Sequence, residues 1–224
     1  MNNNNNIYND EPPKFTREMY IKTLKKGKTP DQKKVVDYFM GGGGCFSKEI
    51  NDAKYDEMVE TKLRSTNFKQ RAIEVLGIDP EQVNEIAPIH FEGFDFEKGR
   101  LIKRGADDLW RSSAYEITWL FFSDTQIYVY QYTFHMEGDA KEESTEEYFY
   151  SDITSFSVMH NTIDKLLPKT NCMGGITYEL KPVDYTAFYL TVPNAHLLCS
   201  MVQSDYTDRA IEGMKAKLRE KKNY

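Results

Sequence analysis

The chain has 224 residues, of which 40% are hydrophobic and 13% aromatic, and its formal net charge is −6 at pH 7. This length is enough for one large globular domain or two small ones, each with a buried core. The acidic balance argues against bulk attraction to nucleic acid or to an anionic membrane, so we expect no nucleic-acid partner.

The chain begins with a polar, asparagine-rich segment, and we predict that residues 1–13 form a disordered tail. Residues 14–88 read as a helical region in which capping residues precede short apolar stripes. The clearest start is Thr29, which is followed by Pro30 and, three positions on, by Gln32. The expected helices begin at or near Thr16, Thr29, Ser47, Phe68 and Asp79, and the one from Ser47 runs to Leu63. Gly77 is placed to end the fourth.

From Ile89 onward the apolar period changes from helical to two, which is typical of strands. We predict a connecting hairpin over 89–114, with residues 100–104 as the partner of the strand that starts at Ile89. Residues 115–224 then form a β-domain that ends in a helix. The expected strands are 115–122, 127–136, 146–151, 153–159, 175–181, 186–192 and 196–202.

Turns and loops separate these strands. Asp124 and Thr125 make a hairpin turn, Glu137 to Glu147 form an acidic loop, and Pro168 to Gly174 form another loop. Asp184 marks a turn between two short strands. The C-terminal helix carries one apolar stripe, made of Ala210, Ile211, Met214 and Leu218.

Seven strands followed by one amphipathic helix are the order of a pleckstrin-homology-like domain. Leu120 to Tyr130 resembles the first hairpin of bacterial pleckstrin-homology-like and GRAM-type domains, and Phe149 to Phe156 resembles their third strand. Phe188 to Asn194 fits the penultimate strand. The resemblance covers about residues 115–222 and implies an α+β fold. That fold is an antiparallel β-sandwich or barrel of about seven strands capped by the C-terminal helix, here preceded by a small helical region.

In lipid-binding members of that family the first hairpin carries lysine and arginine that meet phosphate groups. Here the corresponding turn, Ser123 to Gln126, has one acidic residue and no basic one. The resemblance therefore implies the fold without its best-known headgroup site.

No pattern for catalysis, a cofactor or a metal ion is present. The glycine run Gly41 to Gly44 is not a phosphate loop, because a helix precedes it and Ser47 stands before Lys48. Cys45 has no nearby histidine to activate it. The cysteines and histidines form no ligand spacing: Cys45, Cys172, Cys199, His90, His135, His160 and His196. We therefore expect no catalytic, cofactor-binding or metal-binding residue, and no enzyme.

Two segments of opposite charge suggest an interaction. The N-terminal helical region is basic and the loop after residue 136 is acidic, so the two could dock on each other or join neighbouring molecules. The candidate interaction residues are Lys22, Lys25, Lys26, Lys28, Glu142, Glu143 and Glu146.

The sequence thus predicts a cytoplasmic, non-enzymatic protein-interaction or scaffold module whose partner is another protein or a second copy. The cysteine usage fits a reducing compartment, and neither a signal peptide nor an apolar run of ~20 residues is visible. The expected binding surface is an exposed edge strand or the groove beside the C-terminal helix. Two alternatives stay open: weak lipid association through the basic C-terminal helix, and an enzyme whose site assembles only in the fold.

Overall fold

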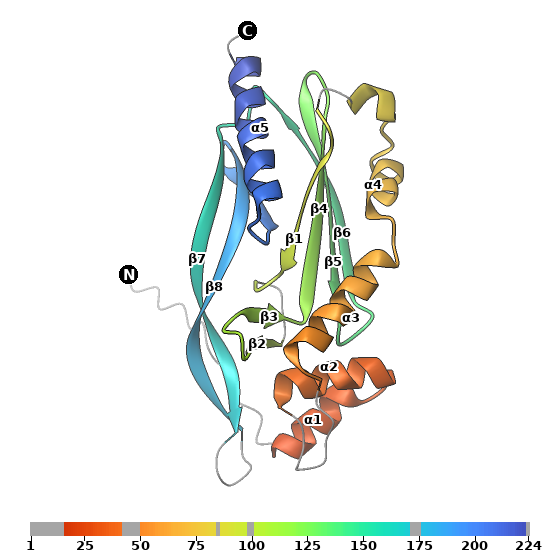
Figure 1. Cartoon of the computed structure of the whole chain (residues 1–224), viewed down its shortest axis with the longest axis vertical. Coiled ribbons are helices and arrows are strands. Elements are labelled where there is room, and N and C mark those ends of the chain that lie inside the picture. The colour runs from red at the N-terminus through yellow and green to blue at the C-terminus, as the bar shows by residue number, and fades with distance from the viewer. Residues whose placement is uncertain (1–15, 42–49, 84–85, 98–100, 171–175, 223–224) are drawn as a thin grey trace, which may run out of the picture.

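A computed structural model describes residues 16–41, 50–83, 86–97, 101–170 and 176–222, and shows an elongated α+β molecule (Figure 1). Four helices come first and a fifth ends the described chain, with three open antiparallel sheets between them. The helices are α1 Arg17–Lys25, α2 Pro30–Met40, α3 Asp52–Arg64, α4 Phe68–Leu76 and α5 Asp205–Lys222, with one 3-10 turn at Pro80–Val83. Of the expected sandwich or barrel, these sheets do not form a closed barrel, because all three are open.

Local capping chemistry sets the helix starts. Thr29 and Gln32 form the predicted capping box, in which the Gln32 N–H donates to Thr29 Oγ1 over 3.3 Å and the Thr29 N–H donates to Gln32 Oε1 over 3.0 Å. Gly77 ends α4 in the left-handed conformation with φ 63°, as expected. The predicted start of α3 at Ser47 is wrong. Asn51 caps this helix by accepting from the Lys54 N–H, and Ser47 itself lies outside the described residues.

The largest sheet has the order β1-β4-β5-β6. Its strands are β1 Ile89–Phe94, β4 Ala114–Phe122, β5 Gln126–His135 and β6 Lys141–Phe149. The predicted hairpin over 89–114, in which residues 100–104 pair with the strand from Ile89, is wrong, because β1 pairs with β4 while β2 Ile102–Arg104 pairs with β3 Trp110–Ser112. The reason is that β4 is buried almost throughout and its backbone needs a partner strand on each side.

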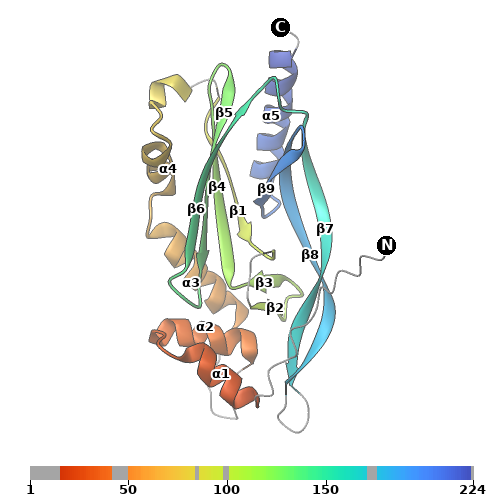
Figure 2. The same ribbon diagram turned by 180° about the vertical axis from the view of Figure 1, so that it is seen from behind.

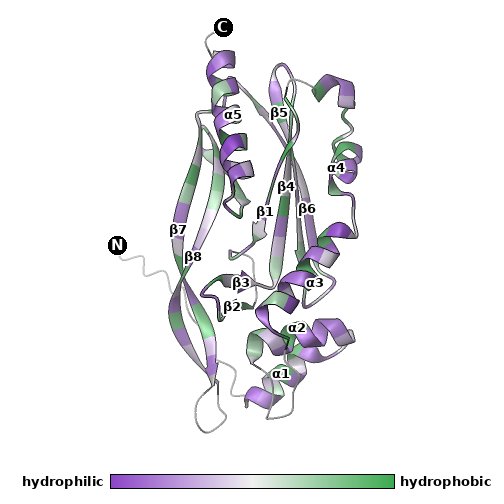
Figure 3. Ribbon diagram, viewed as in Figure 1, coloured by the Kyte–Doolittle hydropathy of each residue, from purple (hydrophilic) through white to green (hydrophobic). Residues whose placement is uncertain are grey.

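The acidic loop predicted from Glu137 to Glu147 is for the most part a strand. Residues Lys141–Phe149 form β6, which pairs with β5 without interruption from Phe134↔Lys141 to Gln126↔Phe149. The long aromatic strand β5 requires main-chain partners on both edges, and that requirement outweighs the low strand propensity of glutamate. β6 is coloured largely hydrophilic in Figure 3 and lies at the outer edge of the sheet (Figure 2).

The second sheet has the order β7-β8-β9, with β7 Ser155–Thr170, β8 Ile176–Val192 and β9 Ala195–Ser200. The turn predicted at Asp184 and the loop predicted from Pro168 are both wrong at these points. Pairing runs without interruption from Ser155↔Thr191 to Thr170↔Ile176, and Asp184 accepts from the Thr162 hydroxyl across the ladder over 2.7 Å.

The β7–β8 hairpin is strongly twisted and therefore contributes side chains to two hydrophobic cores. Its two strands cross over each other in both views (Figures 1 and 2). Phe156 and Phe188 pack in the core between the two large sheets, whereas Val183 packs beside Phe96 and Ile102. Two-stranded ribbons twist more than wide sheets, so the inward face changes along the strand.

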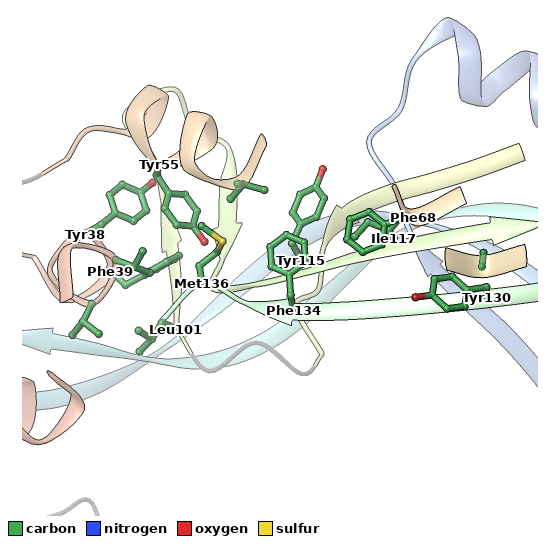
Figure 4. Packing of buried hydrophobic residues seen from close by; sticks show 14 of the residues in the cluster. Tyr38, Phe39, Tyr55, Phe68, Leu101, Tyr115, Ile117, Tyr130, Phe134 and Met136 are labelled. Atoms are coloured by element: carbon green, nitrogen blue, oxygen red, sulfur yellow. The ribbon is translucent and has the colours of Figure 1, made fainter. Parts of the chain in front are cut away.

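The four-stranded sheet has a hydrophobic core on each face. One lies between it and the β7-β8-β9 sheet, where the predicted stripe residues Ile211, Met214 and Leu218 of α5 are buried. The other lies under the N-terminal helices. There Tyr38 stacks on Tyr55 with ring centroids 4.6 Å apart, near Phe134 and Met136 at the end of β5 (Figure 4).

Candidate functional site

Glu143, one of the predicted interaction residues, holds the helical region on the sheet. Arg71 of α4 donates to both carboxylate oxygens of Glu143 over 2.7 Å, and the Tyr130 hydroxyl donates to one of them over 2.7 Å. These bonds lower the pKa of Glu143, the bonds from Arg71 having the largest effect. The sequence signal for Arg71 was weak, because its partner lies 72 positions away.

The three predicted glutamates do not form one patch. Successive side chains of a strand point to opposite faces, so Glu142 and Glu146 lie on the face opposite to Glu143. Glu146 accepts from the Tyr148 hydroxyl on its own strand. The acidic segment is therefore an edge strand that presents charge to both sides.

The predicted lysines are likewise divided. Lys25 pairs with Asp37 of α2, and the Lys28 ammonium donates to the main-chain carbonyl of Glu137. Lys22 and Lys26 are exposed on and just after α1. Gln32 reaches the same turn as Lys28 and donates to Asp139 over 2.7 Å. Docking of the helical region on the sheet thus uses Arg71, Lys28 and Gln32. A role for the predicted residues in binding a partner stays a prediction.

The remaining chemically reactive groups gather nowhere in the described chain. Cys199 is a free, buried thiol whose pKa is raised by burial. Cys45, Ser47, Lys48 and Cys172 lie outside the described residues. His160 contacts Thr186 across its hairpin. Over the described ranges no three His, Cys, Asp or Glu side chains are placed to hold a metal ion, and no helix is long and apolar enough to cross a membrane.

A groove runs between α3 and the edge strand β1, on the helix-covered face of the large sheet. It consists of two hollows of about 450 Å³ and about 440 Å³, which share Glu60, Leu63 and Glu92. Alternate residues of β1 face the helices and line it: His90, Glu92 and Phe94. We name the two parts, after the tryptophan that lines each, the Trp119 hollow and the Trp110 hollow.

The Trp119 hollow lies beside the loop from α3 to α4. Its wall is the stack of His90 on Trp119, with ring centroids 4.7 Å apart and planes inclined by 23°. The Tyr206 hydroxyl lies 3.3 Å from His90 Nδ1. Burial lowers the pKa of His90, because it disfavours the charged imidazolium. The Trp119 indole nitrogen is buried and has no hydrogen-bond partner in the described chain.

The Trp110 hollow is walled by aromatic side chains from five segments. Phe94 packs edge-on against Tyr115 with ring centroids 5.1 Å apart, and the ring centroid of Phe96 lies 5.9 Å from that of Tyr185 of β8. The aromatic residues that line this hollow are Phe94, Phe96, Trp110, Tyr115 and Tyr185.

Carboxylates line the α3 side and the β1 side of the same hollow. Asp56 and Glu60 are four residues apart on α3 and therefore share a helix face. Arg111 donates to Asp56 over 2.8 and 2.7 Å, and Arg64 donates to Glu60 over 2.8 Å. Glu92 differs from both, because its part-buried carboxylate has no hydrogen bond or ion pair within the described chain.

The electrostatics follow from this arrangement. The pKa of Glu92 is raised, first by burial and then by repulsion from Glu60. The pKa of Tyr115 is raised by burial and by the charges of Glu92, Asp56 and Glu60. The carboxylates of Glu92, Asp56 and Glu60 therefore all act on the Tyr115 hydroxyl, in a hollow that Arg111 also lines.

Arg111 holds two walls of the Trp110 hollow together. Its side chain is 4% exposed and bridges Asp56 of α3 to Asp107 of the β2–β3 turn, 2.8 Å from the nearest oxygen of the latter. A buried arginine with two carboxylate partners fixes the distance between helix and turn. The sequence did not predict this site. Its only local signal is Glu92, the one acidic residue of the strand Ile89–Phe94.

Comparison of the chain with protein-family models, with curated proteins and with solved structures finds no match to any of them.

Proposed function

We propose that the protein is a non-enzymatic interaction module that binds an extended segment of a partner protein in the groove between α3 and β1. The observation that carries this proposal is the continuity of the two hollows along β1. Six residues at ~3.3 Å each make β1 roughly 20 Å long, so a short extended segment fits beside it. Aromatic side chains such as Trp110, Trp119 and Tyr185 are the residue types that dominate binding at protein interfaces.

We also propose that residues 89–222 form a pleckstrin-homology-like domain. Its support is the strand order, with one sheet of four strands, a second of three, and a helix at the end. The proposed domain starts at β1 rather than at residue 115, because β1 pairs with β4.

The burial of the apolar face of α5 favours a protein partner over a lipid surface. Its apolar residues Ile211, Met214 and Leu218 are packed in the core and leave no apolar stripe for a membrane. The Lys221 ammonium lies 3.7 Å from a carboxylate oxygen of Asp124 in the β4–β5 turn, so part of the positive charge of α5 is already paired within the chain. We place the protein in the reducing cytoplasm, in keeping with the free thiol of Cys199.

Site-specific crosslinking tests the groove as a partner site. A photo-crosslinking residue at Leu109, which is 61% exposed and lines the Trp110 hollow, should capture a peptide of the partner in the native cells. The same residue at Val75, which is 47% exposed on α4 and lines neither hollow, is the matched control. A crosslinked peptide from the chain itself identifies a second copy as the partner. Equal labelling at both positions, or none at 109, contradicts the proposal.

A further inference from the structure

We infer that the Trp110 hollow recognises one cationic side chain, an ammonium or guanidinium group carried by the bound segment. This inference rests on the proposed function and names the chemistry that selects the partner.

The first support is the aromatic wall. Ring faces carry negative electrostatic potential and attract organic cations within about 6 Å of the ring centroid. Aromatic residues from β1, β3, β4 and β8 line one hollow of about 440 Å³, which is inside the usual range for ligand sites. The described structure places no ammonium group on these rings.

The second support is the charge balance inside the hollow. Asp56 and Glu60 each have an arginine partner, whereas Glu92 has none among the described residues. Asp184 at the rim is exposed and adds a further negative charge. A bound cation removes the repulsion between Glu92 and Glu60 and compensates the ionised Glu92, whose pKa is otherwise raised.

Other ligand classes fit less well. No three His, Cys, Asp or Glu side chains of the described chain are placed to hold a metal ion. An anion would meet Glu92 and Asp184, and a neutral apolar side chain would leave the carboxylate of Glu92 desolvated without compensation. An organic cation satisfies both the carboxylate and the ring faces.

The chain contains only two tryptophans, and one lies in each hollow, so fluorescence reports the site directly. In the full chain with Trp119→Phe, emission comes from Trp110 alone. The probes are the acetyl methylamides of lysine, of trimethyl-lysine and of arginine, with the norleucine compound as a neutral analogue of the same length. We expect saturable changes with at least one cationic probe and none with the neutral one.

Glu92→Gln should weaken that binding roughly tenfold, since a part-buried charge partner of a cation is worth about 1.4 kcal/mol or more. Glu74→Gln, an exposed change on α4 outside both hollows, should leave it unaltered. Urea unfolding of both variants confirms that each is folded. An equal response to the neutral probe, or unchanged affinity in Glu92→Gln, overturns the inference.

The two proposals fail separately. A partner segment that crosslinks at position 109 and binds Glu92→Gln as tightly as the parent overturns the cationic inference and leaves the groove proposal intact. A saturable response to a cationic probe without a crosslink at 109 supports the cationic site and overturns the groove proposal.

Discussion

Two ionised side chains of the groove differ in whether a partner compensates their charge. Arg111 is buried but doubly paired with Asp56 and Asp107, so its charge is compensated. Glu92 is part-buried without a partner in the described chain, so its ionised form is disfavoured by the fold. A side chain that destabilises the folded protein and lines a groove is expected where the residue contributes to binding rather than to folding.

We expect Glu92→Gln to raise the free energy of unfolding at pH 7. The pKa of Glu92 is raised in the folded protein, so its favourable protonated form is lost as pH rises through that pKa. The carboxylate is partly exposed and solvent screens it, so the gain should stay below about 1 kcal/mol. Urea unfolding measures it, and the gain should shrink below about pH 4, where both side chains are neutral. A loss of stability at pH 7 contradicts the assignment.

At the scale of elements, the edge strand β1 depends on a close backbone approach. Val202 N–H donates to the Glu92 carbonyl over 2.9 Å, and this brings residue 201 against Gly93. A Cβ on Gly93 would lie 2.9 Å from the Met201 nitrogen, which is closer than side chains come to backbone. Glycine is therefore required here by space, since this position has no positive φ.

Gly93→Ala should destabilise the protein by about 1–3 kcal/mol, because β1 and the segment after β9 must move apart. Gly213→Ala on α5 is the matched control. A Cβ there meets nothing within 4 Å, so this change should stabilise the helix by about 0.5–1 kcal/mol. Thermal or urea unfolding of both variants tests the pair. Equal effects of the two changes would show that the close approach does not matter.

The strand β6 has an exposed outer edge, and its glutamates protect this edge against pairing with another strand. Residues 141–147 are all exposed, and four of the nine strand residues are glutamate. Like charges opposite each other disfavour pairing with a second β6.

Replacing Glu142 and Glu146 by threonine should therefore promote self-association through this edge. Glu143 is left in place, since it holds α4. Sedimentation velocity over a range of concentrations measures the effect. Glu57→Gln with Glu74→Gln removes the same charge from helix surfaces and serves as the control. Equal sedimentation of the edge variant and this control contradicts the prediction.

At the scale of the whole molecule, ion pairs fasten the helical region to the β-region. Arg71 of α4 meets Glu143 of β6, and Arg111 of β3 meets Asp56 of α3. Hydrogen bonds from Arg111 and Arg71 hold the pKa values of Asp107 and Glu143 below their usual range. A lowered folded-state pKa adds stability above the unfolded value, near pH 4, and loses it as pH falls further.

Stability should thus decrease as pH falls below about 4, with α4 separating from the sheet and the β2–β3 turn loosening. Hydrogen exchange at pH 7 and at about pH 3 should locate the first loss of protection in α4 and in the β2–β3 turn. In the double variant Arg71→Gln with Glu143→Gln the acid-dependent loss for α4 should be smaller. A loss of the same size in parent and variant contradicts this role for the pair.

Local chemistry made several elements predictable from the sequence. Caps such as Thr29 with Gln32, and the stop at Gly77, act within one helical turn and need no distant partner. The stripe of Ile211, Met214 and Leu218 required only a periodic pattern and a core to meet. The β4–β5 hairpin likewise follows from two apolar strands and a short polar turn.

Only the tertiary structure decided which strands pair, because main-chain hydrogen bonds come from residues far away in the chain. Because of that requirement, an acidic segment forms β6 and β1 pairs with β4. For the same reason β8 continues past Asp184 without a turn, as part of a strongly twisted hairpin. The same requirement also divided the predicted Glu142, Glu143 and Glu146 between two faces. The groove belongs to the same class, since Glu92, Glu60 and Trp110 lie on three elements and meet only when these pack.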